Sequence, residues 1–336
     1  MMVLTNSVDE YTGLGKQSLS FAQQTGFRLI TFEEKLQNNI VAKSNRAFYN
    51  ILFLYCAYKL PEVDHRNIIA MSVVAPTNIA AVHFSSCHAY SLFRIHKLSL
   101  FRLILRPINL LYLWLEYRHY KNPKSTNIFL SEIEYEQFKD IYGFSKSKSV
   151  IIRPKLISKF IPKKKEYENI EGRGLNLLFI SHNSKLKGGE IVYGLSSPEY
   201  KYTITVVGDE IRDNGHKNII MLGKKRIEDI DTSKYKYFVY PSKLDSHGFV
   251  LEEMLRGGLV PIYSSETGFG EFLNESPILK VNLCISRINS QKIHAAISKI
   301  EQDLGLFEVI RNALDSRIKA WELRDIKSEV MRKIYV

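Results

Sequence analysis

The sequence predicts an α/β protein of two consecutive domains, each with a parallel sheet covered by helices. Three observations support this prediction. The 336 residues are enough for two hydrophobic cores of ordinary size. Strand-like apolar runs alternate with helical stretches in both halves of the chain, as expected for parallel sheets. One charged segment with prolines and glycines, residues 154–173, interrupts the alternation and is predicted to be a linker.

The first domain is predicted over residues 1–153. Its expected strands are MVLTNS, FRLITF, NIIAMSV, AAVHFS, TNIFLS and SVIIRP. Before the last of these, the segment EIEYEQFKDIYGF has helical spacing and ends at Gly143.

The alternation restarts in residues 174–318, the predicted second domain. Its expected strands are LNLLFIS, YTITVVG, NIIMLG, YFVYPS and LVPIYSS. The end of the chain is helical and amphipathic, and we expect residues 319–336 to form a helix that returns to the first domain. Two Rossmann-like domains facing across a cleft are therefore predicted. In such sheets, ligands bind beyond the carboxyl ends of the strands.

Composition narrows the class of protein. The apolar fraction of 45% and the charged fraction of 24% are those of a soluble globular protein. Cys56, Cys87 and Cys284 are widely separated and fit no metal-ligand spacing or disulfide framework, so we expect buried thiols in a reducing compartment. The first residues lack a basic segment and a long apolar run, which predicts no secretion signal and a cytoplasmic location.

The net charge of +12 points to an anionic partner, such as a phosphorylated ligand, an anionic membrane or nucleic acid. Between Arg94 and Lys121, six Lys and Arg side chains accompany one acid, Glu116, among apolar and aromatic residues. Arg102 and Arg106 at the centre of this segment exclude a transmembrane span. Two interpretations stay open: an amphipathic segment on an anionic membrane surface, which would make the protein peripheral on the inner face of the cell membrane, or a partly buried helical pair with its cations in water. No RNA- or DNA-binding motif appears, so nucleic acid is not an expected partner.

The stretch from residue 240 to 272 has the strongest chemical signal. A strand is expected to end at Tyr240, and a helix is expected to begin near Phe249 after a loop that contains Asp245 and Gly248. Gly248 lets the backbone approach a ligand closely, and the helix start offers unpaired N–H groups, which suits a diphosphate. Asp245 and Glu253 can line the same site and accept hydrogen bonds from sugar hydroxyls.

This stretch resembles the acid-x7-acid motif of the retaining, GT-B-fold glycosyltransferases of family 4. The resemblance implies that Asp245 contacts the donor sugar and that Glu253 holds the ribose of the nucleotide. It also implies that the backbone of Gly248, Phe249 and Val250 lies near the sugar and the diphosphate. Asp245 stands where the family usually has Glu, so its side chain is one methylene shorter.

A second segment, FISHNSKLKG, is similar to the family pattern F-x-G-R-L-x-x-x-K-G. In the family, the Arg and Lys neutralise the leaving diphosphate and take the place of a metal ion. Lys187 matches the Lys, His182 stands where Arg is usual, and Lys185 can supply the missing charge. The resemblance therefore implies Lys187, His182 and Asp245 as catalytic residues, with no metal site and no cofactor besides the sugar nucleotide. Asp229-Ile230-Asp231 is interpreted as surface acids and not as a metal-binding D-x-D.

Two N-terminal segments resemble the family more loosely. Gly13 and Gly15 open a helix after the first strand, like the family's G-G-x-G-R loop near the donor phosphate. His83 matches the first His of a V-H-x-H strand end, and His88 follows at a different spacing. Both histidines are candidates for the acceptor side, and a structural role in the core is the alternative for each.

The resemblance implies a hexosyltransferase-type enzyme. It would move a sugar from a nucleoside-diphosphate donor to a hydroxyl of a glycan or lipid-linked acceptor, of the cell-surface polysaccharide or lipopolysaccharide type, with retention at the anomeric carbon. A nucleotide-sugar epimerase of similar fold is one alternative. A non-catalytic relative that binds a membrane or nucleic acid is another.

Overall fold

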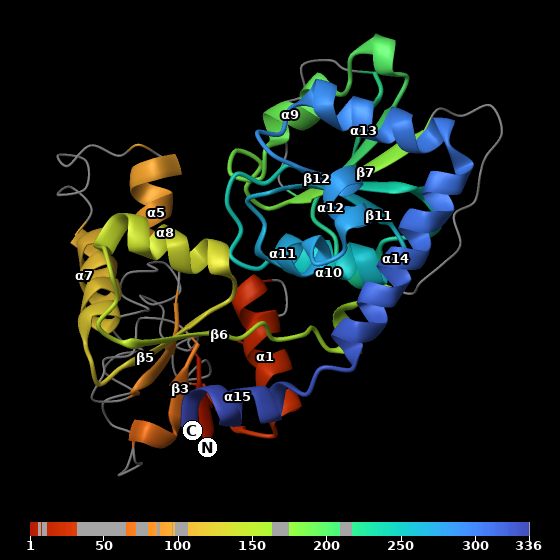
Figure 1. Cartoon of the computed structure of the whole chain (residues 1–336). Coiled ribbons are helices and arrows are strands. Elements are labelled where there is room, and N and C mark those ends of the chain that lie inside the picture. The colour runs from red at the N-terminus through yellow and green to blue at the C-terminus, as the bar shows by residue number, and fades with distance from the viewer. Residues whose placement is uncertain are drawn as a thin grey trace. The chain divides into compact units, whose positions relative to one another are not determined.

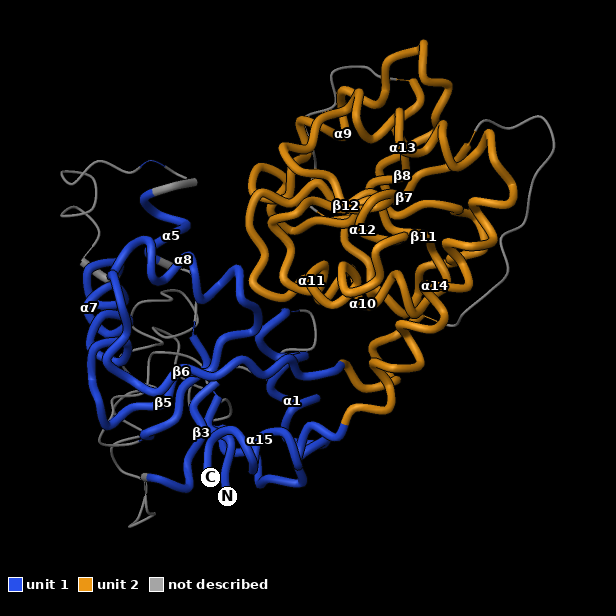
Figure 2. Tube along the Cα trace, viewed as in Figure 1, with its two compact units in different colours: residues 1–155, 325–336 blue, residues 156–324 orange. Residues whose placement is uncertain are grey.

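The computed structural model (Figure 1) describes residues 1–5, 8, 12–31, 65–71, 80–85, 88–95, 97, 107–162, 175–208 and 217–335. The chain divides into two compact units, which are coloured separately in Figure 2. The first unit consists of residues 1–155 and 325–336, and the second of residues 156–324. Each unit contains one six-stranded sheet, so the predicted α/β class is confirmed.

The first sheet has the strand order β2-β1-β3-β4-β5-β6, and all its neighbouring strands are parallel. Its strands are β1 (Met2–Leu4), β2 (Arg28–Ile30), β3 (Ile68–Ala70), β4 (Val82–Phe84), β5 (Thr126–Phe129) and β6 (Lys148–Ile151). Five of these strands lie within segments in which the sequence predicts strands, and β6 begins one residue before its expected segment, SVIIRP.

The helices of the first unit are α1 (Gly13–Thr25), α5 (His88–Tyr90), α7 (Pro107–Lys121), α8 (Glu132–Tyr142) and α15 (Ile326–Tyr335). Short turns of other helix types cover His65–Asn67 and Ser91–Ile95. Helix α1 begins after Thr12, whose hydroxyl accepts a hydrogen bond from the amide of Gly15 at 3.0 Å. Helix α15 packs on α1, and its three buried apolar side chains join the core of this unit: Ile326, Val330 and Ile334. The last residues of the chain thus complete the first core.

The second sheet has the order β12-β11-β10-β7-β8-β9 and is also parallel throughout. Its strands are β7 (Asn176–Ser181), β8 (Thr203–Gly208), β9 (Ile219–Met221), β10 (Tyr237–Tyr240), β11 (Val260–Ser264) and β12 (Cys284–Ile285). From β7 the sheet first grows through β8 and β9, and then on the other side through β10, β11 and β12. The carboxyl ends of β7 and β10 therefore flank a topological switch point, where open α/β sheets bind ligands.

The helices of the second unit are α9 (Gly189–Gly194), α10 (Phe249–Arg256), α11 (Gly268–Asn274), α12 (Pro277–Leu283), α13 (Ser290–Gln302) and α14 (Leu304–Glu322). Single 3₁₀ turns cover Ser158–Phe160, Pro198–Tyr200, Ile227–Asp229 and Thr232–Lys234. Figure 1 shows α9 and α13 on one side of the sheet and α10, α11 and α14 on the other. Asp231 accepts a hydrogen bond from the amide of Ser233 and so caps one of the 3₁₀ turns.

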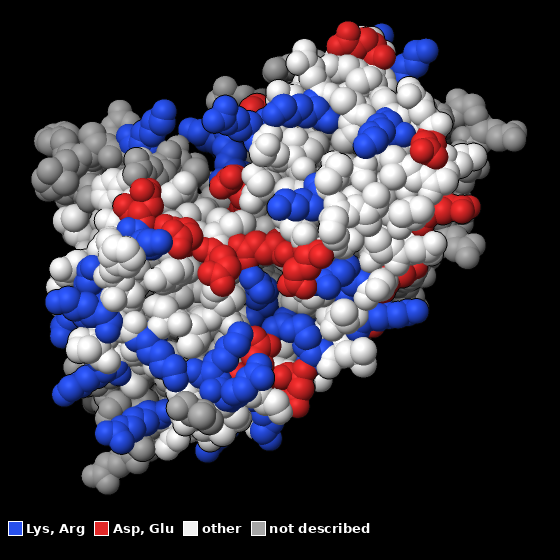
Figure 3. Space-filling view, viewed as in Figure 1, with Lys and Arg blue, Asp and Glu red and all other residues white. Residues whose placement is uncertain are grey.

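Basic side chains are spread over both units. Figure 3 shows Lys and Arg on the surface of each unit, so the net charge of +12 is not confined to one of them. In the part of the chain that the structure describes, no helix is both long enough and apolar enough to cross a membrane.

Candidate functional site

The loops that follow β7 and β10 contact each other at the switch point of the second sheet. The turn after β7 ends at Gly188, which has a φ of +76° and lies so close to Pro241 that a Cβ would overlap its carbonyl oxygen. The amide of Lys243 donates a hydrogen bond to the carbonyl of Leu186 at 2.9 Å. The turn that carries Lys187 is therefore fixed against the segment after β10.

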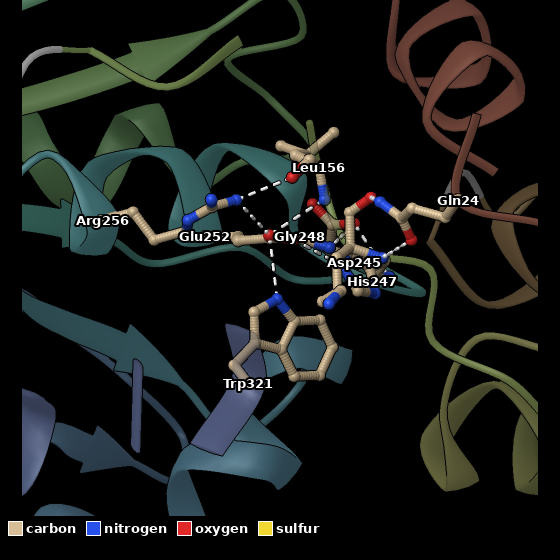
Figure 4. Close-up of polar contacts among 9 residues, drawn as sticks. Gln24, Leu156, Asp245, His247, Gly248, Glu252, Arg256 and Trp321 are labelled. Carbon is tan, nitrogen blue, oxygen red and sulfur yellow. Dashed lines mark hydrogen bonds and ion pairs between the residues drawn. The ribbon is translucent and has the colours of Figure 1, made fainter. Parts of the chain in front are cut away.

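The carboxylate of Asp245 is the centre of this arrangement. Its Oδ1 accepts hydrogen bonds from the amides of Gly248 at 2.8 Å and His247 at 3.3 Å (Figure 4). Its Oδ2 accepts hydrogen bonds from Lys187 Nζ and from the Tyr240 hydroxyl. Lys187, Asp245 and Gly248, which the sequence assigns to one site, are thus joined in one contact network.

Charge and burial decide the protonation of this network. Burial raises the pKa of Asp245, but the Lys187 ammonium and the Tyr240 hydroxyl outweigh burial and hold that pKa below its ordinary value. Burial raises the pKa of Tyr240 well above its usual range, and the charges of Asp245 and Glu253 add to this effect. Asp245 is therefore a carboxylate, and Tyr240 is a neutral hydrogen-bond donor.

Lys187 is held in place but not fully enclosed. Its Nζ donates to Asp245 and also to the carbonyl of Leu244 at 3.2 Å, and it lies 5.5 Å from the centroid of the Tyr240 ring. An ammonium group has three N–H donors, and its side chain here is 20% exposed. Lys187 can therefore direct a donor and a positive charge at a ligand beside Asp245.

The start of α10 supplies a second positive feature. Gly248 has a φ of +88°, and a Cβ on it would lie 2.7 Å from Cγ2 of Thr267. Helix α10 then begins with Phe249 and Val250. The amides in the first turn of a helix have no intrahelical acceptor and carry partial positive charge, so they can bind an anion.

The other predicted residues of the second unit differ in exposure. Glu253 is fully buried on α10, and its charge acts on the Tyr240 phenol. His182 and Lys185 are exposed in the turn before Lys187, and neither makes a hydrogen bond or ion pair with any described residue. The structure thus brings Lys187, Asp245 and Gly248 into contact and leaves the two exposed side chains beside them.

The predicted residues of the first unit lie on two of its elements. Gly13 and Gly15 form the first turn of α1. His83, on β4, is fully buried, and its ring centroid lies 3.8 Å from that of His119. The ring of His83 therefore contacts protein and not solvent. His88 begins α5, and its side chain lies outside the described residues.

Three residues of the second unit have contacts at the site that sequence reasoning did not single out: Tyr240, His247 and Glu252. The position of Tyr240 as the last residue of β10 could have identified it, because it precedes the loop with Asp245.

Across the described ranges, no group of three or more His, Cys, Asp or Glu side chains is placed to hold a metal ion.

Comparison with known proteins adds information on the fold. No family model matches the chain, and no curated protein matches its sequence. WaaG, a glycosyltransferase involved in lipopolysaccharide biosynthesis, is a solved structure with a TM-score of 0.67 and 13% identity, over 99% of this chain and 98% of that chain. Sucrose-phosphate synthase from Thermosynechococcus elongatus has a TM-score of 0.72 and 13% identity, over 99% and 98% of the two chains.

A third similar structure is Anabaena HepE in complex with UDP and glucose. Its TM-score is 0.64 and its identity 14%, over 100% of this chain and 99% of that chain. Identities this low support a shared fold and no finer relationship. Because the likeness covers the full length, it confirms the predicted architecture: this chain has the two-domain GT-B fold.

Proposed function

We propose that this protein transfers a sugar from a nucleoside-diphosphate donor to a hydroxyl of an acceptor. The observation that supports this most is the position of Lys187 and the start of α10 at one switch point, where both can face the same anion. A diphosphate fits this pair, because Lys187 supplies a point charge and the amides of Phe249 and Val250 supply aligned donors. A UDP-sugar is the first donor to test, since the Anabaena protein of the same fold was solved with UDP and glucose.

The chemical step places charge where these groups can stabilise it. The bond between the anomeric carbon and the diphosphate oxygen breaks, while a new bond forms from the acceptor oxygen to the same carbon. The acceptor hydroxyl loses its proton to the departing phosphate or to solvent. Lys187 and the dipole of α10 lower the energy of the charge that develops on the leaving group. Retention at the anomeric carbon is the outcome that the resemblance to family 4 implies.

Asp245 can accept a hydrogen bond from the donor sugar once the donor is bound. In the structure, its Oδ2 accepts hydrogen bonds from Lys187 and Tyr240. A diphosphate that draws Lys187 toward itself leaves Oδ2 available to a sugar hydroxyl. Glu253, further along α10, is assigned to the ribose, and the exposed His182 and Lys185 are assigned to the outer phosphate oxygens.

We assign the acceptor to the first unit, as a glycan or a lipid-linked glycan of the cell-surface type. The region of His83 and His88 is its candidate element, whereas Gly13 and Gly15 keep the donor-binding role that the resemblance implies. His83 is buried, so it can only support such a site from beneath.

An anionic membrane surface is a further partner that we propose for the first unit. Helix α7 exposes Leu110, Trp114 and Tyr117, and their spacing of four and three residues puts them on one face. The Arg118 guanidinium lies 4.8 Å from the centroid of the Trp114 ring on the same helix. Exposed aromatic rings with neighbouring cations suit the headgroup region of an anionic bilayer.

Three other cations of the basic segment from Arg94 to Lys121 cannot be placed on that face of α7. The residues Arg102 and Arg106 and the side chain of Arg94 lie outside the described residues. The membrane proposal therefore depends on the exposed face of α7, defined by Leu110, Trp114, Tyr117 and Arg118.

Donor binding is tested by thermal shift with a panel of UDP-, GDP- and ADP-sugars, followed by a transfer assay. A donor at about 100 times its Kd stabilises the folded state by about 2.7 kcal/mol. Lys187→Ala should lose this shift and reduce transfer by about two orders of magnitude, whereas Lys319→Ala, which changes an exposed lysine on α14, is the control. Equal activity of Lys187→Ala and wild type would contradict the assignment. If the nucleotide-bound sugar is converted into its epimer without any acceptor, the result would instead favour an epimerase.

Membrane binding is tested by flotation with liposomes that contain about 30% anionic lipid, at low and high salt. The double variant Trp114→Ala, Tyr117→Ala should lose flotation, and high salt should weaken flotation of the wild type. The control changes an exposed apolar residue of the second unit, Val281→Ala. Unchanged recovery of the double variant would remove the membrane surface from the proposal.

A further inference from the structure

Glu252, the residue before Glu253 on α10, is a fully buried carboxylate with donors from three separate segments. Its Oε1 accepts hydrogen bonds from the amide of Leu156 at 3.0 Å, from Trp321 Nε1 at 2.9 Å and from Arg256 Nη1 at 3.1 Å (Figure 4). Leu156 is the first residue of the second unit, and Trp321 lies near its last residue, Arg324. One carboxylate oxygen thus joins the first and last segments of this unit to α10.

These donors keep Glu252 charged and fixed. Burial raises the pKa of Glu252, but His247, Arg256 and the amide of Leu156 outweigh burial and bring it below its ordinary value. Arg256 Nη1 also donates to the carbonyl of Leu156 at 2.8 Å, which closes a small ring of contacts. A buried charge with several donors from rigid segments has little freedom to move.

The second oxygen of Glu252 contacts His247, in the loop between Asp245 and Gly248. Its Oε2 lies 3.3 Å from Nε2 of His247, whose side chain is 1% exposed. The ring of His247 packs on Phe249, with 4.2 Å between ring centroids, and on Phe269, with 5.7 Å between centroids. The backbone amide of His247 donates to Asp245 Oδ1. His247 therefore connects the loop of Asp245 with a carboxylate that is anchored elsewhere in the unit.

We propose that Glu252 and His247 are positioning residues for the donor site: the fixed carboxylate holds the His247 ring, and the ring holds the loop from Asp245 to Gly248. This inference rests on the proposed function, because the loop it sets is the one that presents Asp245 and the first amides of α10. Neither residue touches the donor. If the loop shifts by a fraction of an ångström, the amides and the Asp245 partner of Lys187 shift with it.

The test uses three variants and UDP as the probe, or whichever of UDP, GDP and ADP stabilises the wild type most. His247→Phe keeps an aromatic ring but removes the donor to Glu252, whereas His247→Gln places an amide N–H near the former Nε2. Tyr237→Phe is the matched control, because it removes another hydrogen bond of the same unit, from the Tyr237 hydroxyl to Glu301 Oε1 at 2.6 Å, and Tyr237 begins β10 whereas the loop with His247 follows its end. Binding is measured by titration calorimetry, and transfer by steady-state kinetics.

We expect His247→Phe to weaken binding of the nucleoside diphosphate about tenfold and to raise the donor KM by a similar factor, with kcat changed by less than about threefold. His247→Gln should recover most of this loss. Tyr237→Phe should lower the unfolding midpoint but leave the affinity within about twofold of wild type. Wild-type affinity in His247→Phe would overturn the proposal. An equal loss of affinity in Tyr237→Phe would also overturn it, because general destabilisation of the second unit would then explain the effect.

A measurement without ligand separates this inference from the proposed function. The backbone amides of residues 247 and 248 both donate hydrogen bonds to Asp245 Oδ1. Their hydrogen exchange should be about tenfold faster in His247→Phe than in wild type. Unchanged exchange would overturn the positioning role even if the protein binds UDP. If the wild type binds no nucleoside diphosphate but these amides behave as expected, the proposed function fails and the positioning of the loop stands.

Discussion

Replacement of Asp245 by Asn separates the charge of this side chain from its shape. The amide oxygen of Asn can still accept the hydrogen bonds of the His247 and Gly248 amides. The variant lacks the negative charge that faces Lys187, and its NH₂ group cannot accept a bond from the Tyr240 hydroxyl. The structure therefore predicts a loss of stability in the second unit and a looser Lys187.

The magnitude follows from burial and from the two bonds that are lost. The side chains of Asp245 and Lys187 are 19% and 20% exposed, so solvent screens their attraction only partly. A hydrogen bond to a charged group contributes about 1.5–3 kcal/mol. Because the Asn side chain can rotate and recover part of one bond, we expect the free energy of unfolding to fall by about 2 kcal/mol.

The assay is urea unfolding at about pH 7, with Trp321 fluorescence as the reporter of the second unit. The chain has two tryptophans, and Trp114→Phe removes the one in the first unit. Asp229→Asn changes an exposed acid of the same unit and is the control. A loss below about 0.5 kcal/mol, or one equal to that of the control, would refute the reasoning.

The pH dependence of this loss has a definite sign. The native pKa of Asp245 lies below its ordinary value of 3.8, so its charge contributes in full above that value. The contribution disappears as the pH falls through the lower native pKa. The difference in the free energy of unfolding between wild type and Asp245→Asn should therefore be constant from about pH 7 to about pH 5, and it should shrink below about pH 4. A gap that widens in acid would contradict the lowered pKa.

Three further predictions concern other parts of the chain. Gly188→Ala should lower the free energy of unfolding by at least about 2 kcal/mol and weaken UDP binding, because φ at this position is positive and the added Cβ would overlap a carbonyl oxygen. Gly223→Ala is the control, since Gly223 has a φ of +65° and no atom within 4 Å of the added Cβ. In the same urea assay it should lose only the energy of backbone strain, and it should leave UDP binding unchanged. Tyr240→Phe should destabilise the second unit by about 1 kcal/mol by removing the donor to Asp245, and a double-mutant cycle with Asp245→Asn should show a coupling of similar size. Deletion of residues 325–336 removes the three buried apolar side chains of α15 from the first core, and it should destabilise the first unit by several kcal/mol, at about 1.5–3 kcal/mol for each side chain. The unfolding transition reported by Trp321 should not change.

The order of the elements could be predicted from the sequence because the strands are short apolar runs with clear breaks. The strand β12 was missed, since Cys284–Ile285 is too short to show any periodicity. Gly188 and Gly248 both have a positive φ and lie close to another segment of the chain. Of the two, only Gly248 was predicted from the sequence to allow a close approach of the backbone. Features that depend only on neighbouring residues can be predicted from the sequence.

The buried polar contacts could not be predicted, because their partners are distant in the sequence. Glu252 is 96 residues from Leu156 and 69 from Trp321, and no spacing in the chain relates them. Glu116 is the one acid of a basic segment, yet the structure buries it. Its Oε2 accepts hydrogen bonds from the Ala89 amide at 3.1 Å and from the Tyr142 hydroxyl at 3.0 Å. Only the tertiary arrangement shows which acids are structural.

The most direct test of the donor site is a crystal structure of the protein with UDP bound. We predict phosphate oxygens within about 3.2 Å of Lys187 Nζ and of the amides of Phe249 or Val250, with Lys187 turned away from Asp245. A diphosphate bound elsewhere in the second unit, with the ion pair of Lys187 and Asp245 intact, would contradict this prediction.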